Sequence, residues 1–158
     1  MVAQSRIIAF AGSARRGSFN KQLVRVAATG ARTAASEVIE IDLAEYPLPL
    51  FNEDLEAEQG PPENATRLKE LFKAADGFLI ACPEYNSSIS PLLKNTIDWL
   101  SRKAEGEAPL AAFKGKTCAL MSASPGQFGG LRGLVTVRSL LGNIGVLLLP
   151  DQVSVPKA

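Results

Sequence analysis

Several side chains that can bind an anion follow the first apolar run of the chain, at residues 7–11. The polar and cationic members of this stretch are Ser13, Arg15, Ser18 and Asn20. The pattern predicts a buried strand, a tight turn and a helix from Asn20 to about Thr33. Backbone N–H groups at the start of a helix, together with the positive end of its dipole, attract phosphate groups. The stretch therefore predicts a phosphate-binding loop.

Other interpretations of this loop make different demands on the sequence. In an ordinary connection, Ser18 only caps the helix and the arginines only keep the loop soluble. A Walker loop requires a lysine and a hydroxyl residue after its second glycine, whereas Ser18 and Phe19 follow Gly17 here. A dinucleotide-binding loop requires Gly-x-Gly-x-x-Gly, which is absent, although Asp42 could act as its ribose-binding acid. A phosphate loop is the preferred interpretation, and the plain helix cap stays open.

A second group of candidate binding residues follows the apolar run at residues 78–82. Its members are Pro83, Glu84, Tyr85 and Asn86. The aromatic ring, the amide and the backbone groups of this stretch suit the face and edge of a flat heterocycle. The alternative is a turn that merely carries an exposed aromatic residue. The stretch therefore predicts a binding site for a planar ring.

A third turn, rich in glycine and serine, follows the apolar run at residues 117–122. Ser122 ends the run, and Ser124 and Gly126 lie in the turn. Ligands of open α/β sheets bind outside the carboxyl ends of the strands, so the three stretches would converge at one crevice. Flavin mononucleotide (FMN) contains both a phosphate and a flat heterocycle. The sequence therefore predicts FMN as the ligand.

The absence of histidine limits the chemistry that the chain can perform by itself. The 158 residues include 17 Lys and Arg, 16 Asp and Glu and no His, which gives a net charge of +1. Without histidine, Ser-His-Asp and Cys-His catalysis and a histidine-based metal site are excluded. A bound organic cofactor would supply the reactive atoms. The near-neutral charge gives no electrostatic case for nucleic acid or an anionic membrane as a partner.

Two further features of the composition concern the environment of the protein. No apolar stretch approaches the length that spans a bilayer, and we expect a cytoplasmic protein. Cys82 and Cys118 are the only cysteines, and each lies inside an apolar run. They form no CxxC pair, so we expect two buried free thiols in the core.

The order of apolar runs and helical patterns predicts the fold. Strands are expected at residues 7–11, 37–43, 78–82, 117–122 and 145–150, and helices at 20–33, 63–75, from 91 and at 131–141. This alternation predicts an α/β protein with a flavodoxin-like, doubly wound, five-stranded parallel sheet in the order 2-1-3-4-5, with helices on both faces. The second strand is expected at a sheet edge and the third in the centre. Residues 1–158 are expected to form one FMN-binding domain.

Two connections in this pattern carry their own expectations. Four prolines break residues 44–64, and residues 53–58 are acidic, so we expect this segment to be irregular. It would either make a rim or oligomer contact through apolar side chains or be a solvated connection. These side chains are Tyr46, Leu48, Leu50 and Phe51. Ser90 is expected to cap the helix that begins at Pro91. Gly142 is expected to end the last helix in the left-handed conformation.

Three motifs of the chain resemble those of NAD(P)H-dependent FMN reductases, including their quinone and chromate reductase branch. The motifs are Gly12-Ser13-x-Arg15-x-x-Ser18-x-Asn20, Pro83-Glu84-Tyr85-Asn86-x-Ser88 and Leu93-Lys94-Asn95-x-x-Asp98-Trp99. The resemblance implies that the FMN phosphate is held by Ser13, Arg15, Ser18 and Asn20. It implies that the isoalloxazine ring is lined by Pro83, Glu84, Tyr85 and Asn86. Ser122 or Ser124 with Gly126 would close the ribityl or ring side, and Asn95 would fix the local structure rather than touch substrate.

The resemblance also implies an activity, namely that of an FMN-dependent NAD(P)H oxidoreductase. Hydride would pass from NADPH or NADH to the flavin, and the electrons would then pass to a small-molecule acceptor by a ping-pong route. The acceptor would be a quinone, a free flavin, an azo compound or an oxidised metal ion. A flavodoxin-type electron carrier for a protein partner is one alternative, although such carriers are usually strongly acidic. A flavin-free binding domain on the same fold is the other.

Assembly and the end of the sheet are further expectations from the resemblance. It implies a homodimer or homotetramer. The family pattern continues beyond Ala158 into a last helix that covers one face of the sheet. We therefore expect the flavodoxin-like sheet of this chain without that helix.

Overall fold

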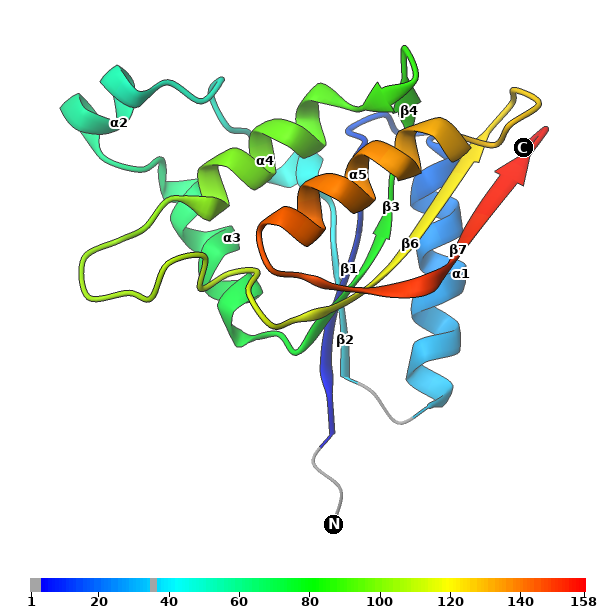
Figure 1. The fold of residues 1–158 in the computed structure, drawn as a ribbon, viewed down its shortest axis with the longest axis horizontal. Coiled ribbons are helices and arrows are strands. Elements are labelled where there is room, and N and C mark those ends of the chain that lie inside the picture. Colours follow the sequence, from blue (N-terminus) through cyan, green and yellow to red (C-terminus); the bar gives the residue numbers. More distant parts are fainter. Residues whose placement is uncertain (1–3, 35–36) are drawn as a thin grey trace.

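The computed structural model describes residues 4–34 and 37–158, which form a five-stranded parallel sheet with helices on both faces (Figure 1). The strands, in spatial order, are β2 (Glu37–Ile41), β1 (Arg6–Ala11), β3 (Gly77–Ala81), β6 (Thr117–Ser124) and β7 (Leu147–Pro156). The helices are α1 (Phe19–Thr33), α2 (Glu53–Gln59), α3 (Glu63–Ala74), α4 (Pro91–Ser101) and α5 (Leu131–Asn143), with a 3-10 turn at Leu43–Glu45. A separate hairpin pairs β4 (Glu84–Tyr85) with β5 (Ser88–Ile89). The strand order confirms the predicted flavodoxin-like sheet, with the second strand at an edge and the third in the centre.

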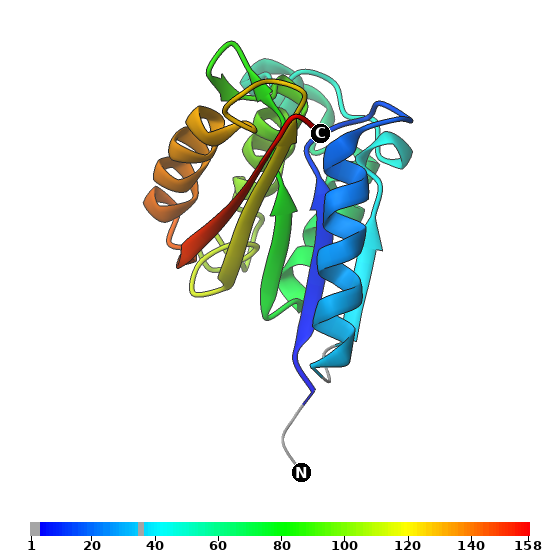
Figure 2. The same ribbon diagram turned by 90° about the vertical axis from the view of Figure 1, so that its right-hand side faces the viewer.

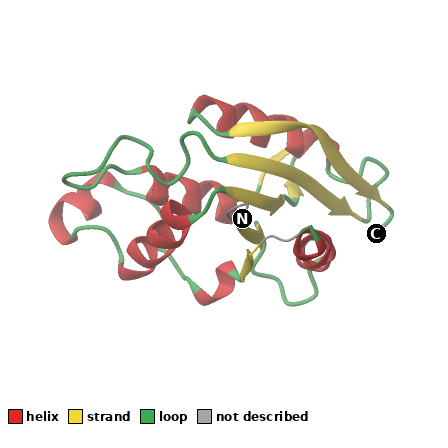
Figure 3. Ribbon diagram, turned by 90° about the horizontal axis from the view of Figure 1, so that it is seen from below, coloured by secondary structure: helices red, strands yellow, loops and turns green. Residues whose placement is uncertain are grey.

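The helices are distributed unevenly between the two faces of the sheet. Helix α1 lies on one face, in front of the sheet in Figure 2, while α3, α4 and α5 lie on the other. Figure 3 shows α1 along its axis, apart from the other helices. Strand β7 is the last element of the described chain, and Val153 on it is half-exposed. Among the described elements, α1 is therefore the only helix on its face.

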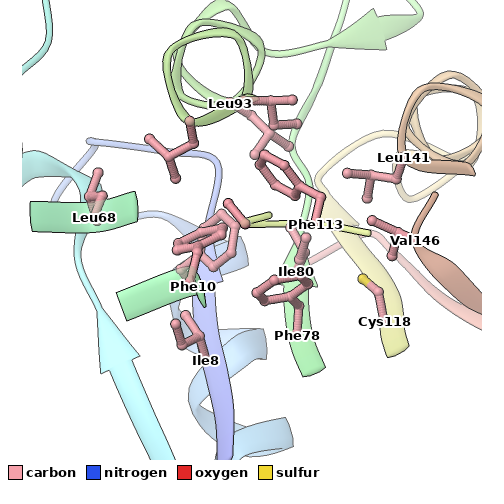
Figure 4. Packing of buried hydrophobic residues seen from close by; sticks show 14 of the residues in the cluster. Ile8, Phe10, Leu68, Phe78, Ile80, Leu93, Phe113, Cys118, Leu141 and Val146 are labelled. Atoms are coloured by element: carbon pink, nitrogen blue, oxygen red, sulfur yellow. The ribbon is translucent and has the colours of Figure 1, made fainter. Parts of the chain in front are cut away.

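Alternating side chains of the strands point to opposite faces of the sheet and form two hydrophobic cores, which differ in the size of their side chains. Between the sheet and α3, α4 and α5, large apolar side chains interlock (Figure 4). Four aromatic rings at its centre, Phe10, Phe72, Phe78 and Phe113, have centroids 5.0 to 6.3 Å apart. The core beneath α1 consists mainly of small residues, so that this helix lies close to the sheet. Aromatic packing therefore holds one face and close backbone approach the other.

The two cysteines are buried free thiols, as predicted. Burial raises the pKa of Cys82 well above its ordinary value. Burial likewise raises the pKa of Cys118 to about 12. Because the thiolate is the nucleophilic form and the raised pKa keeps both thiols protonated, neither side chain is activated as a nucleophile.

Residues 44–64 are more regular than predicted. The prediction of an irregular segment was wrong for residues 53–59, which form α2. Asn52 caps this helix by accepting a hydrogen bond from the Asp54 amide at 2.8 Å, and three acidic residues in the first turn complement the helix dipole. Gly60, with φ of 74°, follows its last turn. Glu53, Asp54 and Glu56 therefore belong to the first turn of a capped helix.

The end of α5 and the start of β7 also differ from the prediction. Helix α5 continues through Asn143, and the left-handed residue is Gly145 (φ 82°), not Gly142. The amide of Val146 donates to the carbonyl of Leu141 and that of Gly145 to Gly142, which is a Schellman motif. Val146 packs beside Leu141 in the core (Figure 4) and so fixes the later end point.

Strand β7 is longer than the predicted strand at residues 145–150. Its pairing with β6 shifts register between Cys118 and Leu120, and Pro150 lies within this irregularity. Within the described ranges, Pro150 has no pairing partner on β6, and β7 has no neighbouring strand on its other side. The proline, which cannot donate a backbone hydrogen bond, therefore removes no hydrogen bond from the sheet. The strand resumes and continues to Pro156.

Helix α4 fixes the segment that precedes α2. Ser90 caps the helix through the Leu93 amide, as the sequence predicts, and Pro91 is its first residue. The Asn95 side chain accepts from the Phe51 amide at 2.8 Å and donates to the Pro49 carbonyl at 2.9 Å. The Trp99 ring donates to the same carbonyl at 2.8 Å. Asn95 therefore has the structural role that the sequence analysis expects.

Glu107 anchors the loop after α4, and its titration should make stability depend on pH. Its carboxylate pairs with Lys69 and, at 2.8 Å, with Lys73. The Lys69 hydrogen bond, supported by that from Lys73, lowers the pKa of Glu107 from 4.5 to about 2. Because the native pKa lies below the unfolded one, this stabilisation is complete above pH 4.5 and disappears as the pH falls toward 2.

We therefore expect Glu107→Gln to lower the free energy of unfolding at pH 7 by about 1.5–3 kcal/mol, the scale of hydrogen bonds to a charged group. Between pH 4.5 and 2 the difference from the wild type should shrink. Urea unfolding at several pH values measures both effects. Glu70→Gln is the matched control, since the exposed Glu70 carboxylate pairs only with Lys73 among the described residues. A constant difference across this pH range would contradict the assignment.

No helix within the described ranges is both long and apolar enough to cross a lipid bilayer.

Candidate functional site

The carboxyl ends of β1, β3 and β6 bring three loops together at the upper edge of the sheet in Figure 1. A pocket between the loops is lined by Ser13, Arg15, Ser18, Phe19, Asn20, Pro83, Glu84, Tyr85, Ala123, Ser124 and Pro125. Eight of the eleven site residues expected from the sequence are among these. Of the other three, Asn86 and Gly126 lie one residue beyond lining residues, and Ser122 is fully buried.

The loop between β1 and α1 is held tightly against the sheet. The Gly12 amide donates to the Ala81 carbonyl at 2.9 Å, and the Gly12 carbonyl accepts from the buried Ser90 hydroxyl at 2.7 Å. A Cβ atom at Gly12 would lie 2.9 Å from that of Leu93. Glycine at this position therefore lets the loop and the start of α4 touch.

The polar side chains of this loop order its backbone at the start of α1. Ser18 is the helix cap, and its hydroxyl accepts a hydrogen bond from the Lys21 amide at 3.4 Å. Ser13 accepts from the Arg15 amide at 3.3 Å, and the guanidinium of Arg15 lies 5.7 Å from the centre of the Phe19 ring. Ser18 is thus the cap of α1, a role that both interpretations of the loop allow. It is compatible with anion binding, because the first N–H groups of a helix have no partner within it.

Asn20 connects the first loop to the third. Its side-chain amide donates to the Ala123 carbonyl at 2.9 Å, and its side-chain oxygen accepts from the Ala123 amide at 3.0 Å. The residue is 4% exposed. This pair of hydrogen bonds fixes the start of α1 against the end of β6, so Asn20 positions two walls of the pocket at once.

The second loop is a tight hairpin that the sequence analysis does not foresee. Asn86 (φ 51°) and Ser87 (φ 65°) form its two-residue turn, with the paired positive φ values of a type I′ turn. Tyr85, directly before the turn, is 50% exposed. The Glu84 carboxylate instead binds α5, through the Gly133 amide at 3.0 Å and the Arg132 guanidinium at 3.1 Å. The hairpin therefore presents an aromatic ring at the pocket while its base is tied to a helix.

The third loop combines a buried hydroxyl with two left-handed glycines. Ser122 donates to the Cys82 carbonyl at 2.7 Å, which joins the ends of β6 and β3. The Ser124 hydroxyl accepts from the Gly126 amide at 3.1 Å. Gly129 (φ 56°) and Gly130 (φ 84°) then turn the chain into α5. Ser122 is thus a structural link beneath the pocket, whereas Ser124 lines it.

Several residues of the site are missing from the sequence prediction. Three of them line the pocket and are next to predicted residues in the chain, namely Phe19, Ala123 and Pro125. Their proximity to predicted residues could have identified them. Arg132 is different, because its ion pair with Glu84 joins residues 48 positions apart. No local pattern indicates such a contact.

Asp42, which could have been the ribose-binding acid of a dinucleotide site, uses both of its carboxylate oxygens within the protein. One carboxylate oxygen pairs with the Lys21 ammonium at 2.7 Å, and the other accepts from the Ala44 amide at 3.0 Å. Burial alone would raise the pKa of Asp42, but the hydrogen bonds from Lys21 and Ala44 lower it below its ordinary value. Asp42 is therefore an ionised cap of the 3-10 turn, paired with α1.

The pocket matches the two chemically different parts of FMN. At one end, hydroxyl groups, the Arg15 guanidinium and the start of α1 provide donors and positive charge for a phosphate. At the other end, Pro83 and the half-exposed Tyr85 provide apolar surface for a planar ring. The donor set of the pocket thus fits FMN.

Comparison with known proteins agrees with this geometry. Residues 5–158 match the family of NADPH-dependent FMN reductases. An NAD(P)H-dependent FMN reductase of Pseudomonas aeruginosa is 38% identical over 137 residues, which cover 86% of this chain and 69% of the relative. A quinone reductase of Escherichia coli K12 is 37% identical over 142 residues, covering 89% and 71%. The chain spans about two thirds of the length of the first curated relatives.

A solved structure extends the similarity to three dimensions. The flavoenzyme NAD(P)H:acceptor oxidoreductase of Paracoccus denitrificans superposes with a TM-score of 0.78 at 29% identity, covering 94% of this chain and 78% of that one. The chain belongs to the NADPH-dependent FMN reductases, a family that uses FMN with NAD(P)H as the reductant.

Proposed function

We propose that this protein is an FMN-dependent oxidoreductase that takes electrons from NADPH or NADH and passes them to a small-molecule acceptor. The observation that carries the proposal is the pocket at the carboxyl ends of β1, β3 and β6, where the start of α1 with Ser18 and Arg15 lies opposite the hairpin that carries Tyr85. Membership of the FMN reductase family and the quinone reductases among the relatives support it. Residues 1–158 would act as one FMN-binding domain.

The first loop would hold the phosphate. Ser13 and Ser18 would donate from their hydroxyl groups, and Arg15 would add a charge-assisted hydrogen bond. Asn20 already uses both of its polar atoms on Ala123, so its part would be to hold the first and third loops at a fixed separation.

The hairpin and the third loop would surround the ring. Pro83, Tyr85 and Asn86 would line the isoalloxazine, with Glu84 at their base, and Ser124 and Gly126 would close the ribityl side above Ser122. Bound FMN would supply the group that accepts hydride and then releases electrons. The chain needs no general base of its own, which agrees with the absence of histidine. Its part would be to bind, to orient and to leave one ring face open.

We propose a quinone as the acceptor, with a free flavin, an azo compound or an oxidised metal ion as further acceptors at the same open face. One face would serve the reductant and the acceptor in turn, which is a ping-pong route. The relatives named as quinone reductases support the first choice.

We also propose a homodimer or homotetramer in the cytoplasm. Leu50, which is 81% exposed, lies in the segment that Asn95 and Trp99 anchor, and it supports an apolar contact between copies. The two free cysteines agree with a reducing compartment. Sedimentation of Leu50→Asp against the wild type tests the contact.

Steady-state kinetics test the proposed activity. With the FMN-loaded protein, NADPH oxidation should require an added benzoquinone, and double-reciprocal plots at several quinone concentrations should be parallel. Flavin-stripped protein is the control and should be inactive until FMN is restored. If FMN binds but NADPH oxidation stays absent with every small acceptor, an electron carrier for a protein partner is the better account.

A further inference from the structure

Glu84 is engaged in a way that the expected contact with the flavin ring does not explain. It stands directly before Tyr85 in the hairpin, and its side chain is only 10% exposed. One carboxylate oxygen accepts from the Gly133 amide at 3.0 Å, and the other from Arg132, at 3.2 Å from Nε and 3.1 Å from Nη2. Both oxygens are thus bound to the first turn of α5.

Helix α5 begins without a cap of its own. The residue before it is Gly130, which has no side chain and no capping hydrogen bond. The first N–H groups of a helix need acceptors, and a negative charge there is favourable because of the helix dipole. The Glu84 carboxylate meets both needs from another element. The cap of α5 is therefore also the link between α5 and the hairpin.

The backbone of α5 is shaped for this link. A Cβ atom at Gly133 would lie 3.1 Å from the Glu84 Cβ and 3.2 Å from the Ser88 carbonyl oxygen. Glycine at this position lets the helix lie directly against both strands of the hairpin. Since the hairpin has only two residues in each strand, it has little stability of its own. Its position therefore depends on α5.

We propose that Glu84 is a positioning residue for the flavin site, which acts by fixing the hairpin to α5 rather than by contacting the flavin. This inference rests on the proposed function. According to this inference, the Glu84 carboxylate fixes the orientation of Tyr85, which lines the ring side of the pocket, and of Asn86 beside it. Its negative charge is balanced by Arg132 and by the dipole of α5.

Two variants separate the link from a direct contact. Glu84→Ala removes both hydrogen bonds and should weaken FMN binding about fivefold, the equivalent of a lost helix cap of about 1 kcal/mol. Glu84→Gln keeps an oxygen for the Gly133 amide and loses the smaller contribution of the charge, so it should stay within about twofold of the wild type. Quenching of FMN fluorescence on binding gives the dissociation constants.

Amide hydrogen exchange of the apoprotein supplies a readout that does not involve FMN. Residues 84–89 should exchange faster in Glu84→Ala than in the wild type, whereas Glu84→Gln should protect them. Residues of β1 and β3, which should be unchanged in all three proteins, control for general destabilisation.

The outcomes are distinct. Wild-type affinity and wild-type exchange in Glu84→Ala would overturn the inference. Weaker FMN binding in both variants with wild-type exchange of residues 84–89 would also overturn it, because it would indicate a direct contact of the charge with FMN. If the wild type binds no FMN, the proposed function fails. The exchange experiment alone then decides whether Glu84 holds the hairpin.

Discussion

Gly130→Ala should lower the free energy of unfolding by about 2–5 kcal/mol, which combines the cost of a Cβ atom at positive φ with that of overpacking. The added Cβ would lie 1.9 Å from the Ser122 hydroxyl oxygen and 2.8 Å from its Cβ. Ser122 is fully buried, and its hydroxyl is bound to the Cys82 carbonyl, so any movement away from the added Cβ would break that hydrogen bond. The substitution should therefore separate the ends of β3 and β6. Thermal unfolding should show a midpoint roughly 10 °C lower, given the size of the chain.

Gly115→Ala is the matched control for this prediction. Gly115 has a similar backbone conformation (φ 79° against 84°), but nothing lies within 4 Å of an added Cβ atom. It should cost only about 1–2 kcal/mol, the penalty of the left-handed conformation alone. Equal destabilisation by both substitutions would show that the contact with Ser122 is unimportant.

Arg15→Ala should raise the dissociation constant of FMN about tenfold or more, since a hydrogen bond to a charged group contributes about 1.5–3 kcal/mol. Arg15 lines the pocket beside Ser13 and Ser18. Its guanidinium is the cationic group among the pocket-lining residues, and it is held near the Phe19 ring. Because the side chain is exposed, added salt should weaken binding more in the wild type than in the variant. Titration of FMN at two ionic strengths measures both effects.

The neighbouring arginine provides the control. Arg16 is also exposed but is not among the residues that line the pocket. Arg16→Ala should change the dissociation constant by less than about threefold, the scale of a screened charge outside the site. Equal losses in the two variants would mean that only general positive charge attracts the phosphate.

The sequence was informative about the fold wherever local physics decides the structure. Apolar runs bounded by turn residues located β1 and β3, and the Ser90-Pro91 pair located the start of α4, because a cap and an N1 proline are local requirements. The order of strands followed from the alternation of strands and helices. The prolines of residues 44–64 were given too much weight, since Asn52 and the acidic residues after it form a helix start between them.

Contacts between distant residues account for the other differences. The Schellman motif at Gly145 depends on the packing of Val146 against Leu141, and the irregular pairing of β7 depends on its position at the sheet edge. Neither is visible in a local pattern, so the sequence alone predicts the ends of these elements at Gly142 and Pro150.

The sequence predicts which residues line the candidate site better than it predicts the hydrogen bonds among them. Residue types and the topological rule for α/β sheets were enough to bring Ser13, Arg15, Pro83 and Tyr85 to one pocket. The roles of Asn20, Glu84 and Ser122 depend on hydrogen bonds across 40 residues or more. The sequence predicts each of these polar side chains as a ligand contact. In the structure, each one forms hydrogen bonds that join two walls of the site.

An anaerobic titration followed by visible absorption tests the central claim most directly. The protein is mixed with FMN, freed of unbound flavin, and titrated with NADPH and then, in a second sample, with NADH. We predict flavin bands that stay with the protein and bleach on addition of the reduced nucleotide, with the faster bleach identifying the preferred one. Arg15→Ala, treated in the same way, should retain less flavin. Protein that retains no flavin would contradict the assignment of the pocket, and retained flavin that neither nucleotide bleaches would contradict the proposed activity.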